Sequence, residues 1–333
     1  MGGLSKKVFQ IHNITQSENE KRLLLDAGNL LFKRPEINKG PSQERLTAES
    51  IIDIYKGLEF DAVGVGPLDL SGSIDLLINS KNNGFPWISA NLFDGDNKPL
   101  FNQWINRKVG NIEIRITALT GSIRNASPKL VRQDPETVLP DLLALLKKDN
   151  KDTFIILLST LTNEENKRIA AGYPAINLII GADGRKANIN PYFLQDCLLT
   201  QTSKQGKYQG VLQVNFGTKR KWGKDNAKIL ADLQNKLGSL TWQLRRLEIK
   251  AKLLGNEEKY QSSILRLHKE KAVMDKKIDL AKETLSKEKK DGAVNDQFTY
   301  RFIGLQTNMP NDQPTVEKLT LLNQKIRALH KKN

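Results

Sequence analysis

Short apolar runs alternate with helical periodicity over the first two thirds of the chain. Runs rich in β-branched residues or leucine predict strands at 22–25, 61–65, 86–90, 112–119, 153–158, 177–180 and 208–216. Apolar residues that recur every three or four positions predict helices at 3–13, 47–57, 71–83, 135–149 and 163–171. This alternation indicates an α/β domain over residues 1–217.

Capping and loop residues refine this prediction at one helix start and at the ends of the predicted strands. Asp134-Pro135-Glu136 combines a capping Asp, a Pro at the first helical position and an acid in the first turn, which predicts a helix start. The loops that follow the predicted strands are rich in Gly and Asp. Polar side chains are therefore expected at strand ends, where α/β folds build their sites.

The pattern changes after a basic linker at 218–224 (TKRKWGK). Over residues 225–290, apolar residues alternate at spacings of three and four, which is typical of a coiled-coil seam. The seam residues are Leu230, Leu233, Leu237, Leu240, Leu244, Leu247, Leu254, Ile264, Leu267, Met274, Ile278 and Leu285.

Gly255-Asn256 interrupts this repeat. A Gly stop followed by an Asn cap favours an antiparallel hairpin of two helices of about 30 residues, each roughly 45 Å long. One continuous helix with a skip in its heptads is the alternative. The seam itself is expected to be packing rather than a site.

Residues 291–333 are expected to form a return segment and a helix. The run FTYRFIGL (298–305) would return the chain to the globular domain. Pro314 can open a helix whose apolar face would add a third member to the hairpin. That face comprises Leu319, Leu322, Ile326 and Leu329.

The net charge of +15 adds a candidate interaction surface. About twenty Lys and Arg stand against about ten Asp and Glu in residues 219–290, which suggests attraction to nucleic acid, anionic lipid or acidic protein. A Lys-rich solvated surface explains the same excess. Only Trp222, Trp242 and Tyr260 offer stacking there, so nucleic-acid binding is weakly supported. The sequence has no apolar run of about 18 residues and no signal peptide as given.

The cysteine and the three histidines do not predict a redox or metal site. The single Cys197 lies in the apolar stretch FLQDCLL, which predicts a buried strand residue, with a reactive thiol as the alternative. His12, His268 and His330 fall on predicted helices or in the tail, where surface positions are expected rather than a metal cluster.

Six segments together resemble one family. They are LLLDAGNLLF (23–32), FDAVGVGPLDL (60–70), FPWISANLFD (85–94), FIILLSTLTNEE (154–165), NLIIGADGRK (177–186) and QGKYQGVLQV (205–214). Their order and spacing over residues 2–217 resemble the metallophosphoesterase domain of bacterial 5'-nucleotidases and UDP-sugar hydrolases. The resemblance implies a metallophosphoesterase-like β-sandwich flanked by helices, without its first strand and followed by the coiled-coil hairpin.

In that family, two metal ions bound at strand ends activate a water and hold the phosphate. The resemblance assigns the bridging Asp of an Asp-Ala-Gly-Asp loop to Asn29, which lacks the charge. The Gly-Asn-His-Asp motif corresponds to Gly66-Pro67-Leu68-Asp69, where Pro67 offers no ligand and Leu68 no proton. Asp69, which orients the His in the family, has none to orient.

Two further motifs depart from the family pattern. Ser-His-Leu corresponds to Ser159-Thr160-Leu161, and Gly-Gly-His-x-His to Gly181-Ala182-Asp183-Gly184-Arg185. No catalytic residue, metal or other cofactor is therefore expected. A residual pocket of Asn29, Asp69, Asp183 and Arg185 remains, in which Arg185 offers an anion site. Alternatively, these loop residues satisfy one another.

The resemblance also bears on the start of the chain. The family's opening Asp-x-His strand precedes a Gly-Gly-Leu helix, which corresponds to Gly2-Gly3-Leu4, so a truncated N-terminus is expected. Exported relatives without the metal ligands can carry a Cys-rich segment at that place, sometimes with selenocysteine. By resemblance the location is periplasmic or envelope-associated.

Three functions are consistent with these observations. The first is a non-catalytic, 5'-nucleotidase-like envelope protein that acts as a binding or scaffold module, with an unidentified protein partner at the hairpin. The second is a redox protein whose reactive Cys or selenocysteine lies upstream of Met1. The third is a basic hairpin that binds nucleic acid or anionic membrane.

Overall fold

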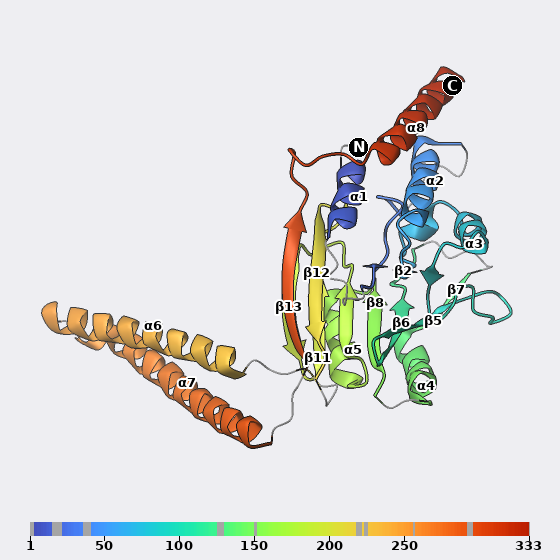
Figure 1. Ribbon diagram of the computed structural model, residues 1–333. Helices are drawn as coiled ribbons and strands as arrows, with labels where there is room; N and C mark the ends of the chain where they lie inside the picture. The colour runs from blue at the N-terminus through green and yellow to red at the C-terminus, as the bar shows by residue number, and fades with distance from the viewer. Residues whose placement is uncertain are drawn as a thin grey trace. The chain divides into compact units, whose positions relative to one another are not determined.

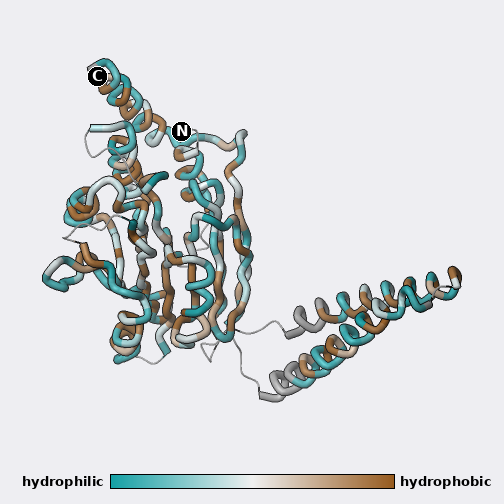
Figure 2. The backbone as a smooth tube through the Cα atoms, turned by 180° about the vertical axis from the view of Figure 1, so that it is seen from behind, coloured by the Kyte–Doolittle hydropathy of each residue, from teal (hydrophilic) through white to brown (hydrophobic). Residues whose placement is uncertain are grey.

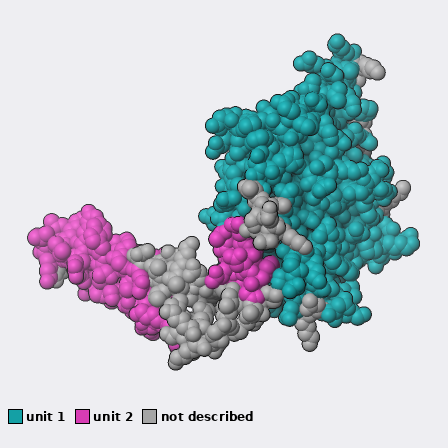
Figure 3. Space-filling view, in the orientation of Figure 1, with its two compact units in different colours: residues 1–212, 300–333 teal, residues 213–299 magenta. Residues whose placement is uncertain are grey.

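The computed structural model describes residues 3–14, 22–35, 41–124, 130–149, 152–217, 222, 226–255, 257–291 and 296–332. The chain divides into two compact units (Figure 3). Unit 1 comprises residues 1–212 and 300–333, and unit 2 comprises residues 213–299.

Two sheets form the framework of unit 1 (Figure 1). The smaller has three parallel strands in the order β1-β2-β3, and the larger has six in the order β10-β11-β9-β8-β6-β5. The four inner strands of the larger sheet are parallel, and both edge strands, β10 and β5, are antiparallel to their neighbours. The bounds are β1 Leu25–Asp26, β2 Ala62–Gly64, β3 Trp87–Ile88, β5 Trp104–Val109, β6 Ile112–Leu119, β8 Phe154–Ser159, β9 Leu178–Gly181, β10 Ile189–Leu194 and β11 Cys197–Gln201.

Two further strand pairs complete the sheets. β4 pairs with β7, and β12 pairs with β13. The chain passes from unit 1 to unit 2 along β12 and returns along β13. The bounds are β4 Leu92–Phe93, β7 Val131–Arg132, β12 Tyr208–Asn215 and β13 Gln297–Gly304.

Helices pack on the two sheets of unit 1. The Asp134 side chain accepts from Glu136 N at 2.8 Å with Pro135 in the first turn, which confirms the predicted start of α4. α5 begins with a capping box between Thr162 and Glu165. The bounds are α1 Leu4–Asn13, α2 Gln43–Lys56, the short 3₁₀ helix η1 Asp69–Ser71, α3 Ile74–Asn82, α4 Pro135–Lys147, α5 Asn163–Gly172 and α8 Gln313–Lys332.

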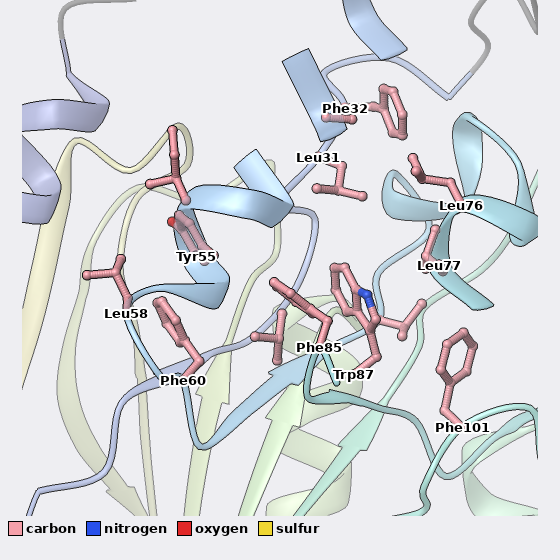
Figure 4. Close-up of a cluster of buried hydrophobic side chains, with 14 of the residues drawn as sticks. Leu31, Phe32, Tyr55, Leu58, Phe60, Leu76, Leu77, Phe85, Trp87 and Phe101 are labelled. Carbon is pink, nitrogen blue, oxygen red and sulfur yellow. The ribbon is translucent and has the colours of Figure 1, made fainter. Parts of the chain in front are cut away.

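Two apolar clusters hold these layers together. In the first, aromatic and aliphatic side chains from α1, α2, α3 and the small sheet meet, with Trp87 and Leu77 almost fully buried (Figure 4). In the second, alternate residues of the large sheet such as Ile155 and Leu157 pack against α4 and α5. The other face of the large sheet meets the small sheet, because a Cβ added at Gly64 would lie 3.5 Å from Ala118 Cβ. The result is the predicted β-sandwich with helices outside.

Unit 2 is dominated by two helices that pack against each other, α6 Asn226–Leu253 and α7 Glu257–Asp291 (Figure 1). Gly255 lies between them with φ +57, a conformation that favours glycine. The chain therefore reverses there, and one continuous helix does not describe it.

Apart from Leu254, the predicted seam residues are buried or half-buried where their side chains are described. Leu244, Leu267 and Ile278 are the most buried of them. Leu254 is 59% exposed, contrary to its assignment to the seam, because α6 ends at Leu253 and leaves Leu254 in the turn. The half-buried ones are Leu233, Leu237, Leu240, Leu247, Ile264 and Met274; the side chains of Leu230 and Leu285 lie outside the described part.

The C-terminal helix corrects one expectation. α8 belongs to unit 1 and packs against α1 and α2 rather than joining the hairpin. Lys318 Nζ lies 2.7 Å from Asp53 Oδ2 of α2, and Leu319 packs against the first apolar cluster. The apolar face was recognised correctly, but nothing in its spacing says which partner it covers. Among the described helices, none combines the length and apolar character needed to cross a membrane.

Candidate functional site

The four predicted pocket residues lie in loops that follow parallel strands. Asn29 follows β1, Asp69 follows β2, and Asp183 and Arg185 follow β9. β1 and β2 belong to the small sheet and β9 to the large one, so these loops can approach each other only where the ends of the two sheets meet. They do so: Asn29 N donates to Asp69 Oδ2 at 2.8 Å, and Asn29 Nδ2 donates to Ala182 O at 3.4 Å.

Asp69 is fully buried and holds two loops together. Its Oδ2 accepts from Asn29 N and Gly66 N, and its Oδ1 accepts from Leu31 N, each at 2.8 Å. Burial raises the pKa of Asp69 to about 7, although these three backbone donors act in the opposite direction. Asp69 therefore orients the backbone N–H groups of two loops.

Asn29 has a structural role in the same loops. Its Oδ1 accepts from Leu68 N at 3.0 Å, and its backbone has φ +59. A side chain at Gly66 would collide with the Asn29 carboxamide, so that position requires glycine. The oxygen that could serve as a metal ligand thus already accepts a hydrogen bond.

Asp183 and Arg185 form a two-point pair. Arg185 Nε donates to Asp183 Oδ1 and Arg185 Nη2 to Oδ2, both at 2.9 Å. These hydrogen bonds, helped by Asn163 N, lower the pKa of Asp183 to about 2. Gln201 anchors the backbone of Asp183 from β11 through two hydrogen bonds. The Arg185 side chain is nevertheless 69% exposed, so it faces solvent as well as Asp183.

The side chains of Ser159 and Thr160, in the Ser-Thr-Leu motif, also form hydrogen bonds within the protein. Ser159 Oγ donates to Asn166 Oδ1 at 2.6 Å, and both residues are buried. Thr160 Oγ1 accepts from Gly121 N at 2.9 Å, which joins the loop after β8 to the loop after β6. The hydroxyl groups of Ser159 and Thr160 are therefore occupied by hydrogen bonds within the protein.

The residues at the family's ligand positions do not fit a pair of metal ions. Both carboxylate oxygens of Asp69 accept backbone hydrogen bonds, and a guanidinium cation stands at Asp183, where a metal ion would be repelled. Among the described residues, no three His, Cys, Asp or Glu side chains are placed to hold a metal ion. His12 lies 3.5 Å from Asp312 and His268 lies 3.4 Å from Glu248.

Cys197 lies on β11 and is fully buried. Burial raises the pKa of its thiol to about 12, so little thiolate forms near neutral pH. The predicted buried strand residue is confirmed. The redox alternative concerns residues that this sequence does not contain, and it stays a prediction.

A cavity of about 330 Å³ adjoins the loop after β2, and sequence reasoning missed it. Pro67, Leu68 and Ser71 line one part of it, and Ser122 and Arg124 line another. The polar run after strand 112–119 could have indicated this cavity, because the loop after that strand and the loop after β2 both line it. Among the described residues that line it, apolar side chains stand beside the cationic Arg124.

Comparisons with solved structures give the same fold. The 5'-nucleotidase precursor of Thermus thermophilus matches with a TM-score of 0.62 and 17% identity over 98% of this chain and 54% of that one. The sulfate thiohydrolase SoxB of Thermus thermophilus, solved with glycerol, matches with a TM-score of 0.63 and 14% identity over 98% and 47%. The NAD nucleotidase of Haemophilus influenzae matches with a TM-score of 0.53 and 15% identity over 65% and 46%.

These likenesses establish the fold, which is that of the 5'-nucleotidase-type metallophosphoesterases. The chain spans about half the length of the solved structures it matches. No protein-family model and no curated protein matches it.

Proposed function

We propose that this protein is a non-catalytic, 5'-nucleotidase-like module of the cell envelope that binds or organises a partner. The fold supports the nucleotidase-like part of this proposal. The absence of metal-dependent catalysis is supported by Pro67 and Leu68, whose side chains offer no ligand group for a metal ion. The periplasmic location is carried over from the resemblance alone.

The observation that carries the proposal is the role of Asp69. In an active site of this fold, an acidic residue at this position would orient an imidazole toward the substrate. Here its two oxygens accept three backbone N–H groups inside the protein, and the neighbouring Leu68 is aliphatic. The loop edge has thus become a packed structural element, while the scaffold around it is retained.

The same edge retains features suited to a small anion. Arg124 lines the cavity, and Arg185, in the loop after β9, has a side chain that is 69% exposed. A phosphate or carboxylate is the ligand class that a guanidinium recognises best. The proposal therefore includes binding of an anionic ligand without turnover, and a protein partner at the hairpin.

The test measures turnover and binding on the same preparation. With Mn²⁺ present, we expect no hydrolysis of AMP or UDP-glucose, and no Mn²⁺ binding by titration calorimetry. Titration with inorganic phosphate, AMP or UMP should raise the melting temperature of the wild type, with a smaller shift for Arg124→Gln. Mn²⁺-dependent hydrolysis that is abolished by Asn29→Ala would overturn the proposal.

A further inference from the structure

The outer face of α6 carries apolar side chains that the seam does not use. Trp242, Ile249 and Leu253 are 61, 53 and 80% exposed. Their spacings of seven and four residues place them on one stripe of the helix. Leu244 and Ala251 are buried in the seam, and each lies two residues along the chain from a member of the stripe. On an α-helix, this offset places the stripe roughly 160° around the helix axis from the seam.

The stripe continues into the turn of the hairpin. Leu254 follows Leu253 and is 59% exposed, and Gly255 with φ +57 then reverses the chain. The turn end of the hairpin is accordingly brown in Figure 2. Two neighbouring leucines are thus exposed to solvent at the turn end of the hairpin.

Basic side chains border this apolar stripe. Arg245, Lys250 and Lys252 are exposed, and the Arg246 guanidinium lies 5.3 Å from the ring centroid of Trp242. Residues 242–260 contain five Lys and Arg against three Asp and Glu. Over residues 226–291 the counts are 16 and 10, so the whole hairpin carries an excess of positive charge.

We propose that this stripe docks on an anionic lipid surface. Ile249, Leu253 and Leu254 would enter the boundary between headgroups and acyl chains, with Trp242 at headgroup level. An interfacial helix needs this combination of exposed aliphatic residues, a Trp and flanking cations. Each Lys or Arg near an anionic bilayer adds to the attraction, and long basic side chains extend from the apolar stripe to the headgroups.

The positive charge and the exposed leucines of the hairpin favour an anionic bilayer over a second copy of the chain or a nucleic acid. A second copy would bring two positively charged hairpins together, which is unfavourable at low salt. A nucleic acid would use the basic residues and Trp242, but it gives the exposed Leu253 and Leu254 no partner. An anionic bilayer satisfies both the cations and the aliphatic side chains.

The experiment sediments the full chain with vesicles of phosphatidylcholine, with and without phosphatidylglycerol. We expect binding that requires phosphatidylglycerol and weakens as salt is added. The double variant Leu253→Gln/Leu254→Gln should lower the affinity about ten-fold or more. Lys250→Gln/Lys252→Gln should lower it by a similar factor of about ten.

Leu321→Gln is the matched control, since Leu321 of α8 is 57% exposed and lies outside the hairpin. It should bind vesicles as the wild type does. Circular dichroism should give equal helicity for all variants, because each replaced side chain is exposed.

Three results would overturn the proposal. The first is no binding of the wild type to phosphatidylglycerol vesicles, or binding that Leu253→Gln/Leu254→Gln leaves unchanged. The second is a dimer in light scattering that this variant dissociates, without vesicle binding, which would assign the stripe to a second copy. The third is oligonucleotide binding alone, unaffected by the leucine substitutions.

Discussion

The α/β unit and the hairpin bury their apolar residues in different ways. All six residues of β8 are buried, because the small sheet covers one face of this strand and helices cover the other. Among the described side chains of α6, the buried Leu244 and Ala251 lie on one stripe, and Trp242, on the opposite face, is 61% exposed. The core of unit 1 therefore depends on contacts between segments distant in sequence, while the hairpin depends on a locally repeated spacing.

The two regions also differ in their buried polar groups. Unit 1 buries Asp69, Asn91 and Thr120 in hydrogen bonds that join separate loops. The buried seam residues of the hairpin, where their side chains are described, are all apolar. Loop geometry in unit 1 is thus specified by polar contacts, and helix pairing in unit 2 by apolar ones. The following substitutions test this difference, beginning with the largest expected effect.

Trp87→Ala tests the dependence of unit 1 on its buried aromatic core. Trp87 is 1% exposed, its Nε1 donates to Ser80 Oγ at 2.9 Å, and its ring lies 4.8 Å from that of Phe85. The cavity left behind should lower the free energy of unfolding by about 3–5 kcal/mol. Urea denaturation followed by circular dichroism measures this change.

Trp242→Ala is the matched control for this prediction. The ring is exposed on α6, so its removal should change the stability by about 0.5 kcal/mol or less. Equal effects of the two substitutions would contradict the assignment of Trp87 to the core.

Leu244→Asp tests the hairpin seam. A carboxylate without a partner at this buried position should destabilise the hairpin by about 3 kcal/mol and reduce its helicity. Thermal melting followed at a helix-sensitive wavelength reports both effects. Ile249→Asp, on the exposed face of the same helix, should leave the melting curve nearly unchanged. An unaltered melt for Leu244→Asp would mean that the seam is not buried in the monomer.

The buried carboxyl of Asp69 should make the stability of unit 1 depend on pH. Its folded pKa of about 7 lies above the unfolded value of about 4, so the folded state binds more protons between these values. Stability should therefore fall as pH rises through this window, by a total of about 2 kcal/mol between pH 5 and 7. Denaturant titrations at several pH values measure the slope.

Asp69→Asn should remove this slope, whatever its effect on the absolute stability, because no proton is exchanged at the amide. Asp75→Asn, at the exposed start of α3, should retain it. A slope that survives in Asp69→Asn would assign the titration to another group.

Arg185→Gln should have the smallest effect. The pair with Arg185 depresses the pKa of Asp183 to about 2, so the pair stabilises the fold above the unfolded pKa and loses this contribution as pH falls toward 2. Without the guanidinium, the pKa of Asp183 should rise toward its ordinary value, as measured by carboxyl NMR titration. Arg168→Gln, which alters an exposed pair with Glu136, should leave Asp183 unchanged. An unshifted Asp183 in Arg185→Gln would contradict the bidentate pair.

Elements specified by local interactions were predicted more accurately from the sequence than elements that depend on distant contacts. The start of α4 at Pro135 and the strand at 112–119 were predicted well, because capping and β-branched runs act locally. β10 was missed, since Pro191 and a bulge interrupt its pattern at a sheet edge. β5, the opposite edge strand, was missed because polar residues alternate along WINRKV.

The sequence predicts a residual pocket at Asn29, Asp69, Asp183 and Arg185 but not the hydrogen-bond partners of these residues. The family resemblance places these residues in one pocket, and hydrogen bonds join Asn29 to Asp69 and to Ala182, the residue before Asp183. Their partners could not be predicted, because Asp69 binds backbone groups of Asn29 and Leu31, about 40 residues earlier in the chain. The cavity beside Arg124 was hidden for the same reason.

By itself, the sequence determined the inner strands β6, β8 and β9 of the large sheet, the apolar seam of α6 and α7, and the absence of ligand groups from the side chains of Pro67 and Leu68. Periodicity and residue identity are local properties that need no partner. Only the tertiary structure decided that α8 packs on α2 and that Arg185 pairs with Asp183. Those outcomes depend on which surfaces and polar groups the folded chain brings within contact distance.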